Sequence, residues 1–201
     1  WNASGDKLAL AVSTADQHRI SLVTPTSPLH ASYKLNNMPD IQHDKFIFAL
    51  AFSPQQKKSC DLFFTASADH TVKSWEIAED LSVSGGRCIH GQHSSAVDAL
   101  CFSNKKPSVL VSGGADKKVI AWDLNKEALA FNVLLEKPVC CIADNPTSPS
   151  VFLALQIGKD EQIQILDLRK NRAVQSLGWA CPDKPSPSKY LTASWHMSGN
   201  F

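Results

Sequence analysis

Short apolar segments alternate with turn residues along most of the chain. These segments are rich in β-branched and aromatic side chains, as strands are, and no stretch shows a competing helical period. Turns are predicted at 68–70 and 115–117, and at the pairs Gly85-Gly86 and Gly113-Gly114. The pattern therefore predicts an all-β fold with strands at 47–52, 63–67, 72–75, 87–89, 97–102, 109–112, 119–122 and 131–135.

Two groups of these strands share one layout. It is marked by a His before the first strand, an Asp in a turn and a Trp that ends the third strand: His43, Asp69 and Trp75 in one group, His93, Asp116 and Trp122 in the next. The two Trp lie 47 residues apart, as do the two Asp, while the two His lie 50 apart. A period of about 40 to 50 residues built from short strands indicates the blades of a β-propeller.

The period divides the chain into repeat units. We predict units at about 1–40 (partial), 41–90, 91–136, 137–181 and 182–201 (partial), which together form one propeller portion. The first and fourth units are degenerate. Asp16 and Asp160 hold the turn position in these two units, but neither unit has the Trp, and Leu166 stands in its place in the fourth.

This pattern resembles the WD-repeat family of β-propellers, most strongly from 41 to 124. In that family a His, a Ser or Thr, an Asp and a Trp of one blade form a hydrogen-bonded tetrad. The resemblance implies such a structural tetrad at His43, Ser67, Asp69 and Trp75. It implies a second at His93, Asp116 and Trp122, where Gly114 stands at the hydroxyl position, so that one link is missing or is supplied by water.

Physical chemistry supports a structural role for these residues, because a buried indole N–H needs an acceptor and a buried carboxylate needs donors. Propellers of this family most often have seven blades. The resemblance therefore implies that these four or so units are part of a seven-bladed ring. Without further blades, the open strand edges would invite pairing or aggregation.

Some of these residues are also of the types found in catalytic sites and metal sites. Ser67, His43 and Asp69 are the residue types of a hydrolase triad, but the same types recur beside a Trp that catalysis does not need. Cys88, His90 and His93 offer three zinc ligands where zinc needs four. No glycine-rich phosphate loop is present. We predict a protein that is not an enzyme and has no metal and no cofactor.

The composition indicates in which compartment the protein is located and which class of molecule it binds. The net charge of +1 gives no basic field for nucleic acid, and no apolar run reaches the roughly 18 residues of a membrane span. Six cysteines without a Cys-x-x-Cys pair favour a reduced intracellular compartment, cytoplasmic or nuclear. The expected partners are other proteins or peptides.

The resemblance also implies a partner-binding face, at the position three residues after the tetrad His and at the position just before the turn Asp. With their neighbours, the candidates are Phe46, Phe48, Ala68, Ala96, Asp98, Ala115, Lys159 and Lys189. Phe46 and Phe48 are the only large apolar anchors among them, and Phe48 fits a position between blades equally well.

Two functions are compatible with these residues. The first is a non-catalytic scaffold for protein–protein interaction within a multiprotein complex. The second is a substrate receptor that docks a cullin-4-type ubiquitin ligase through Asp167 and Arg169, because some WD-repeat proteins end a blade with Trp-Asp-x-Arg. Here Leu166 replaces that Trp.

Overall fold

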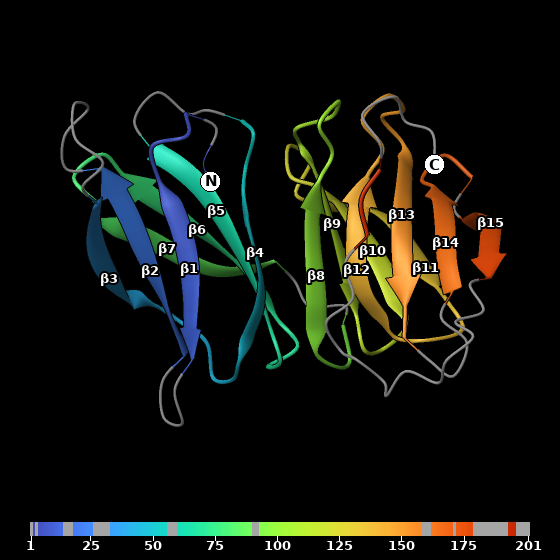
Figure 1. Ribbon diagram of the computed structural model, residues 1–201, viewed down its shortest axis with the longest axis horizontal. Helices are drawn as coiled ribbons and strands as arrows, with labels where there is room; N and C mark the ends of the chain where they lie inside the picture. The colour runs from blue at the N-terminus through green and yellow to red at the C-terminus, as the bar shows by residue number, and fades with distance from the viewer. Residues whose placement is uncertain are drawn as a thin grey trace. The chain divides into compact units, whose positions relative to one another are not determined.

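The computed structural model describes residues 2, 4–13, 18–25, 33–55, 60–89, 93–157, 162–170, 172–178 and 193–195. The predictions at Asp16, Lys159, Asp160 and Lys189 lie outside these residues. The chain divides into two compact units, unit 1 at Trp1–Gly91 and unit 2 at Gln92–Phe201 (Figure 1). All regular elements described are strands, which confirms the predicted all-β fold.

Unit 1 contains two antiparallel sheets. Three strands in the order β1-β2-β3 form the first: β1 (Leu8–Ser13), β2 (His18–Pro25) and β3 (Tyr33–Gln42). Four strands in the order β4-β5-β6-β7 form the second: β4 (Ile47–Phe52), β5 (Cys60–Ser67), β6 (Val72–Ala78) and β7 (Val83–Ile89).

Unit 2 contains two four-stranded antiparallel sheets. The first holds β8 (Val97–Phe102), β9 (Val109–Gly114), β10 (Lys118–Asp123) and β11 (Ala128–Leu134). The second holds β12 (Val139–Asp144), β13 (Val151–Gln156), β14 (Gln162–Asp167) and β15 (Arg172–Gly178). In every sheet each strand pairs with the next along the chain, so each sheet is a meander of the kind that forms one propeller blade.

Each predicted strand lies on an observed one, but the prediction of a turn at Gly85-Gly86 was wrong. Both glycines lie inside β7, at a register shift opposite Ser74 and Trp75. They adopt φ values of +113° and +78°, a region that glycine enters without steric cost. The bulge brings the backbone close to the indole, because a Cβ on Gly86 would lie 3.0 Å from the Trp75 ring. Gly113 and Gly114 end β9, as expected for a glycine pair that permits a tight strand end.

Apolar side chains fill the space between the two sheets of each unit. In unit 1 the core cluster joins the first sheet to the second through Ala9, Ile20, Leu22, Met38, Ile47, Phe63, Trp75 and Ile77. In unit 2 a larger cluster joins residues of β8–β11 to Val139, Ile142, Phe152, Ala154 and Leu166. Removing these apolar side chains from water stabilises each unit. Across the described ranges, no helix has the length and apolar character needed to cross a membrane.

Candidate functional site

A buried chain of hydrogen bonds links four side chains in unit 1. His43 Nδ1 lies 2.8 Å from Asp69 Oδ2, and its Nε2 lies 2.6 Å from Thr65 Oγ1. Trp75 Nε1 donates to the same Thr65 oxygen at 2.9 Å. The ionised Asp69 carboxylate can only accept, so the imidazole proton sits on Nδ1. Burial lowers the pKa of His43 and keeps the ring neutral, so its Nε2 accepts from the Thr65 hydroxyl, whose oxygen accepts the indole N–H. The set therefore describes a neutral His43 beside an ionised Asp69.

The hydroxyl in this chain is that of Thr65, so the prediction of Ser67 was wrong. Trp75 lies directly across from Phe63 in the sheet, and its indole reaches the diagonal neighbour Thr65 on the same face. Ser67 lies two residues further on, where its hydroxyl donates to the Lys45 carbonyl at 3.2 Å and accepts the Asp69 N–H at 3.1 Å. Ser67 therefore closes the turn at the end of the blade.

Unit 2 contains the corresponding set. His93 Nδ1 lies 3.0 Å from Asp116 Oδ1, and its Nε2 lies 2.9 Å from Ser112 Oγ. Trp122 Nε1 donates to that hydroxyl oxygen at 3.4 Å, a longer contact than in unit 1. The prediction that Gly114 leaves the set without its hydroxyl was therefore also wrong, because Ser112 supplies that hydroxyl. A Cβ on Gly114 would lie 2.6 Å from the Ala96 carbonyl oxygen and 3.1 Å from His93 Nδ1, so glycine gives the His–Asp pair its space.

The last sheet of unit 2 replaces this polar set with apolar residues. Leu135 stands at the His position, because it precedes β12 by the spacing at which His43 precedes β4. Ala154 stands at the hydroxyl position, because it pairs with Ile142 as Thr65 pairs with Leu50. Leu166 stands at the Trp position. All three replacements are buried. Replacing the His, the hydroxyl and the Trp together leaves none of these three groups without its hydrogen-bond partner, which is why a blade can lose them without large cost. The turn aspartate of this unit, Asp160, lies outside the described residues.

The protonation of these groups follows from burial and hydrogen bonding. Burial lowers the pKa of His43 and of His93, although the neighbouring aspartate opposes the effect in each case. Burial alone would raise the pKa of Asp69, but hydrogen bonds from Thr71 and His43 outweigh it and hold this pKa at about 2. The pKa of Asp116 is lowered in the same way, by the Ser94 N–H and by His93.

These shifts predict a loss of stability in acid. A His whose folded pKa lies below the ordinary 6.5 binds a proton more readily when unfolded, so its contribution is full above 6.5 and falls as the pH drops below it. The contribution of Asp69 is full above 3.8 and is lost as the pH falls through about 2. We expect urea unfolding to show a free energy that decreases progressively from neutral pH into this acid range. A free energy of unfolding that stays constant from neutral pH to about pH 4 would contradict these protonation states.

Ser67, His43 and Asp69, which are the residue types of a hydrolase triad, are not arranged for catalysis. The Ser67 hydroxyl bonds to the Lys45 carbonyl and not to His43, and its side chain is buried. Both nitrogens of His43 are occupied. Among the residues that the structure describes, no three His, Cys, Asp or Glu side chains gather in a geometry suited to a metal ion.

The candidate partner-binding residues lie at the strand ends beside the two polar sets. In unit 1, Phe46 and Phe48 are 52% and 51% exposed, and the ring of Phe46 lies 4.6 Å from that of His18. Ala68 donates its N–H to the Phe46 carbonyl at 2.8 Å. Ala115 donates to the Ala96 carbonyl at the same distance in unit 2, where Ala96, Asp98 and Ala115 are half-buried. The structure thus brings these residues together in pairs within each unit.

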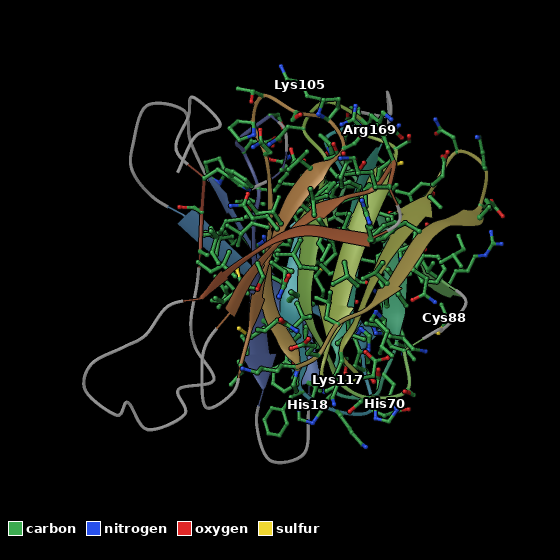
Figure 2. All side chains as sticks on the ribbon, turned by 90° about the vertical axis from the view of Figure 1, so that its right-hand side faces the viewer. His18, His70, Cys88, Lys105, Lys117 and Arg169 are labelled. Atoms are coloured by element: carbon green, nitrogen blue, oxygen red, sulfur yellow. The ribbon has the colours of Figure 1, made fainter. Side chains whose placement is uncertain are left out.

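Asp167 and Arg169 form a fork at the end of β14. The Nε and Nη2 atoms of Arg169 donate to the two carboxylate oxygens of Asp167 at 3.0 and 2.8 Å. The Arg169 hydrogen bond lowers the pKa of Asp167. The Arg169 side chain remains 69% exposed. In Figure 2, Arg169 and Lys105 lie at one end of unit 2 and Lys117 lies at the opposite end. Lys117 is in the turn after Ala115, so the fork does not share a face with Ala96 and Ala115.

Comparison with known proteins agrees with this architecture. The family model described as "WD domain, G-beta repeat" matches residues 38–76 and 86–123, which include both His–Asp–Trp sets. The WD40 domain of coronin from Toxoplasma gondii superposes with a TM-score of 0.69 at 15% identity, covering 94% of this chain and 46% of that one. The chain contains two WD repeats. Its sheets are therefore propeller blades, and the resemblance predicted from the repeats is confirmed.

Curated relatives of this WD-repeat chain are longer proteins. Protein lethal(2)denticleless from Drosophila melanogaster is 29% identical over 125 residues, covering 61% of this chain and 15% of the relative. The E3 ubiquitin-protein ligase COP1 from Pisum sativum is 36% identical over 78 residues, covering 39% of this chain and 11% of the relative. WD-repeat domains generally bind other proteins and are generally not catalytic.

Proposed function

We propose that this WD-repeat protein is a non-catalytic scaffold that binds protein or peptide segments within a multiprotein complex, with Phe46 and Phe48 as its main anchors. The observation that carries the proposal is the exposure of these two rings, each above half, on a backbone that the neighbouring polar set holds in place. Aromatic residues concentrate binding energy at interfaces, and a site that is already ordered binds with little entropic cost.

Several contacts fix the segment that carries these rings. His43 and Ile47 are buried on either side of Phe46, and the Asp44 N–H donates to Asp69 Oδ2 at 3.2 Å. The Ala68 N–H holds the Phe46 carbonyl. Exposed aromatic side chains on an anchored backbone suit recognition of an apolar peptide or loop better than recognition of nucleic acid, which needs a basic surface.

An intracellular location, cytoplasmic or nuclear, is part of this proposal. Among the described residues, the cysteines at positions 60, 88, 101 and 141 form no disulfide. Thiols persist in reducing compartments, whereas small secreted domains tend to pair them. We also infer that further blades complete a ring of about seven, as is usual for the family.

The anchoring role is tested by the double substitution Phe46→Ala, Phe48→Ala in the full-length protein. We expect recovery of its protein partners in quantitative affinity purification to fall at least about tenfold, because exposed aromatic anchors commonly carry 2 kcal/mol or more. Leu35→Ala is the matched control, since Leu35 is 59% exposed on β3 of the same unit. Equal recovery with the double variant and the control would remove Phe46 and Phe48 from the proposal.

A second candidate function is that of a ubiquitin-ligase substrate receptor. Its support is the exposed guanidinium of Arg169, which Asp167 holds in a fixed orientation, together with the similarity to COP1, whose name is that of an E3 ubiquitin-protein ligase. Arg169→Glu is expected to abolish pull-down of a cullin-4 adaptor if docking occurs there, with Lys170→Glu as the neighbouring control. Adaptor binding that is absent from the wild-type protein, or unaffected by Arg169→Glu, would exclude this function.

A further inference from the structure

Three turns lie in a row at one end of unit 2, namely those that follow β8, β12 and β14. The Asn104 N–H donates to Asp144 Oδ2 at 2.8 Å and joins the first of these turns to the second. The Leu168 N–H donates to the Ser150 carbonyl at 2.8 Å and joins the second to the third. Hydrogen bonds therefore hold the three turns side by side, with the turn after β12 in the middle.

The two outer turns of this row carry exposed lysines. Lys105 and Lys106 follow β8, and Lys170 follows β14. None of these three forms an ion pair with another residue that the structure describes. Arg169 differs, because its guanidinium donates to both carboxylate oxygens of Asp167. Figure 2 shows Arg169 and Lys105 at the same end of the unit.

The carboxylates at this end do not neutralise the three lysines. Asp144 is buried, and Asp123 Oδ2 lies 3.8 Å from Lys126 Nζ. Glu127 likewise has a partner. The middle turn, 145–150, contains no charged residue. Positive charge therefore remains in excess on both sides of an uncharged turn.

The positions of the lysines favour an extended ligand with several negative charges. Lys105 and Lys170 belong to different sheets, and packed sheets lie about 10 Å apart, so a single phosphate or carboxylate is too small to contact both. An extended peptide places side chains on one face about every 7 Å, so a run of acidic residues reaches both sides of the middle turn.

A nucleic-acid strand is also an extended polyanion, but it fits this surface less well. Single strands bind by stacking their bases on exposed aromatic rings as well as through charge. Within the part of unit 2 that the structure describes, no aromatic side chain is exposed. The surface therefore suits an acidic peptide better than it suits nucleic acid.

We propose that this row of turns binds an acidic segment of another protein, an extended run of Asp and Glu residues. Lys105 and Lys106 contact one part of the segment and Lys170 contacts another, while the segment crosses the uncharged turn between them. Complementary charge of this kind accelerates association and selects the partner. The surface belongs to unit 2 and does not involve Phe46 or Phe48 of unit 1, so it is a second binding site.

Fluorescence anisotropy with a labelled oligoglutamate peptide and the full-length protein tests this proposal. We expect oligoglutamate to bind the wild type with a Kd that rises steadily with salt concentration. The double variant Lys105→Glu, Lys170→Glu should raise that Kd at least about tenfold, because each substitution replaces an attraction with a repulsion.

The double variant Lys34→Glu, Lys117→Glu is the matched control. It makes the same change in net charge at exposed lysines, one on β3 of unit 1 and one at the opposite end of unit 2 (Figure 2). Its Kd for oligoglutamate should stay close to that of the wild type. Oligoglutamate that does not bind the wild type, or that both double variants weaken equally, would overturn the proposal. So would binding of oligoglutamine with the same Kd, or tighter binding of an oligothymidylate of equal charge.

Discussion

Replacing Asp69 by alanine is expected to lower the free energy of unfolding by about 3 kcal/mol, because four donors, among them the buried His43 ring, lose their acceptor at once. The carboxylate accepts from His43 Nδ1 at 2.8 Å, from the Thr71 N–H and hydroxyl at 3.0 and 2.6 Å, and from the Asp44 N–H at 3.2 Å. Its side chain is only 7% exposed, so water cannot replace these bonds without opening the turn.

Urea denaturation of Asp69→Ala beside Asp80→Ala measures this effect. Asp80 also sits in a turn between strands and accepts one backbone bond, from the Ser82 N–H at 2.9 Å, but it is exposed. The Asp80 variant should unfold almost as the wild type does. If the two variants lost equal stability, the contribution of Asp69 would be that of an ordinary turn residue and the buried set would have no special role.

Much of this architecture could be predicted from the sequence, because its signals are local. The strands follow from short β-branched and aromatic runs, and the blade period follows from the spacing of residue types that are rarely interchangeable. Trp75 and Asp69 are such types, since few other side chains combine burial with an obligatory donor or an ionised acceptor. Their partner His43 lies far from them in sequence but at a recurring position before the first strand.

The hydroxyl was missed because hydroxyl residues are common in this region, at Thr65, Ser67, Thr71 and Ser74. Which of them meets the indole depends on the pairing of β5 with β6, and a shift of two residues keeps a side chain on the same face. Counting back from Asp69 therefore could not separate Thr65 from Ser67. The choice requires the position of Trp75 opposite Phe63.

The candidate partner-binding face shows the same division between local and non-local information. The aromatic identity of Phe46 and Phe48 is read from the sequence, but their exposure depends on the packing of β1, β2 and β4 around them. Phe48, which fitted a position between blades equally well, is half exposed. Similarly, Gly85-Gly86 looked like a turn because the bulge opposite Trp75 is a property of two paired strands.

The central claim is that the Thr65 hydroxyl links Trp75 and His43 by hydrogen bonds inside the blade, and that this buried set stabilises the fold and has no catalytic role. A double-mutant cycle on unfolding free energy tests it most directly, using Thr65→Val, Trp75→Phe and the double variant, with Ser67→Ala in a parallel cycle. Thr65→Val keeps the shape and removes only the hydroxyl, so it should cost about 3 kcal/mol, since it orphans both the indole N–H and His43 Nε2. Ser67→Ala, which loses only turn contacts, should cost about 1 kcal/mol.

The two cycles should differ in coupling. Trp75→Phe alone is expected to cost about 1–3 kcal/mol, because the N–H is lost and the smaller phenyl ring leaves part of the buried space unfilled. Combined with Thr65→Val its cost should be less than additive by about 1 kcal/mol, whereas combined with Ser67→Ala the costs should add. Additive costs for Thr65 and Trp75, or coupling of Trp75 to Ser67 in their place, would contradict the account.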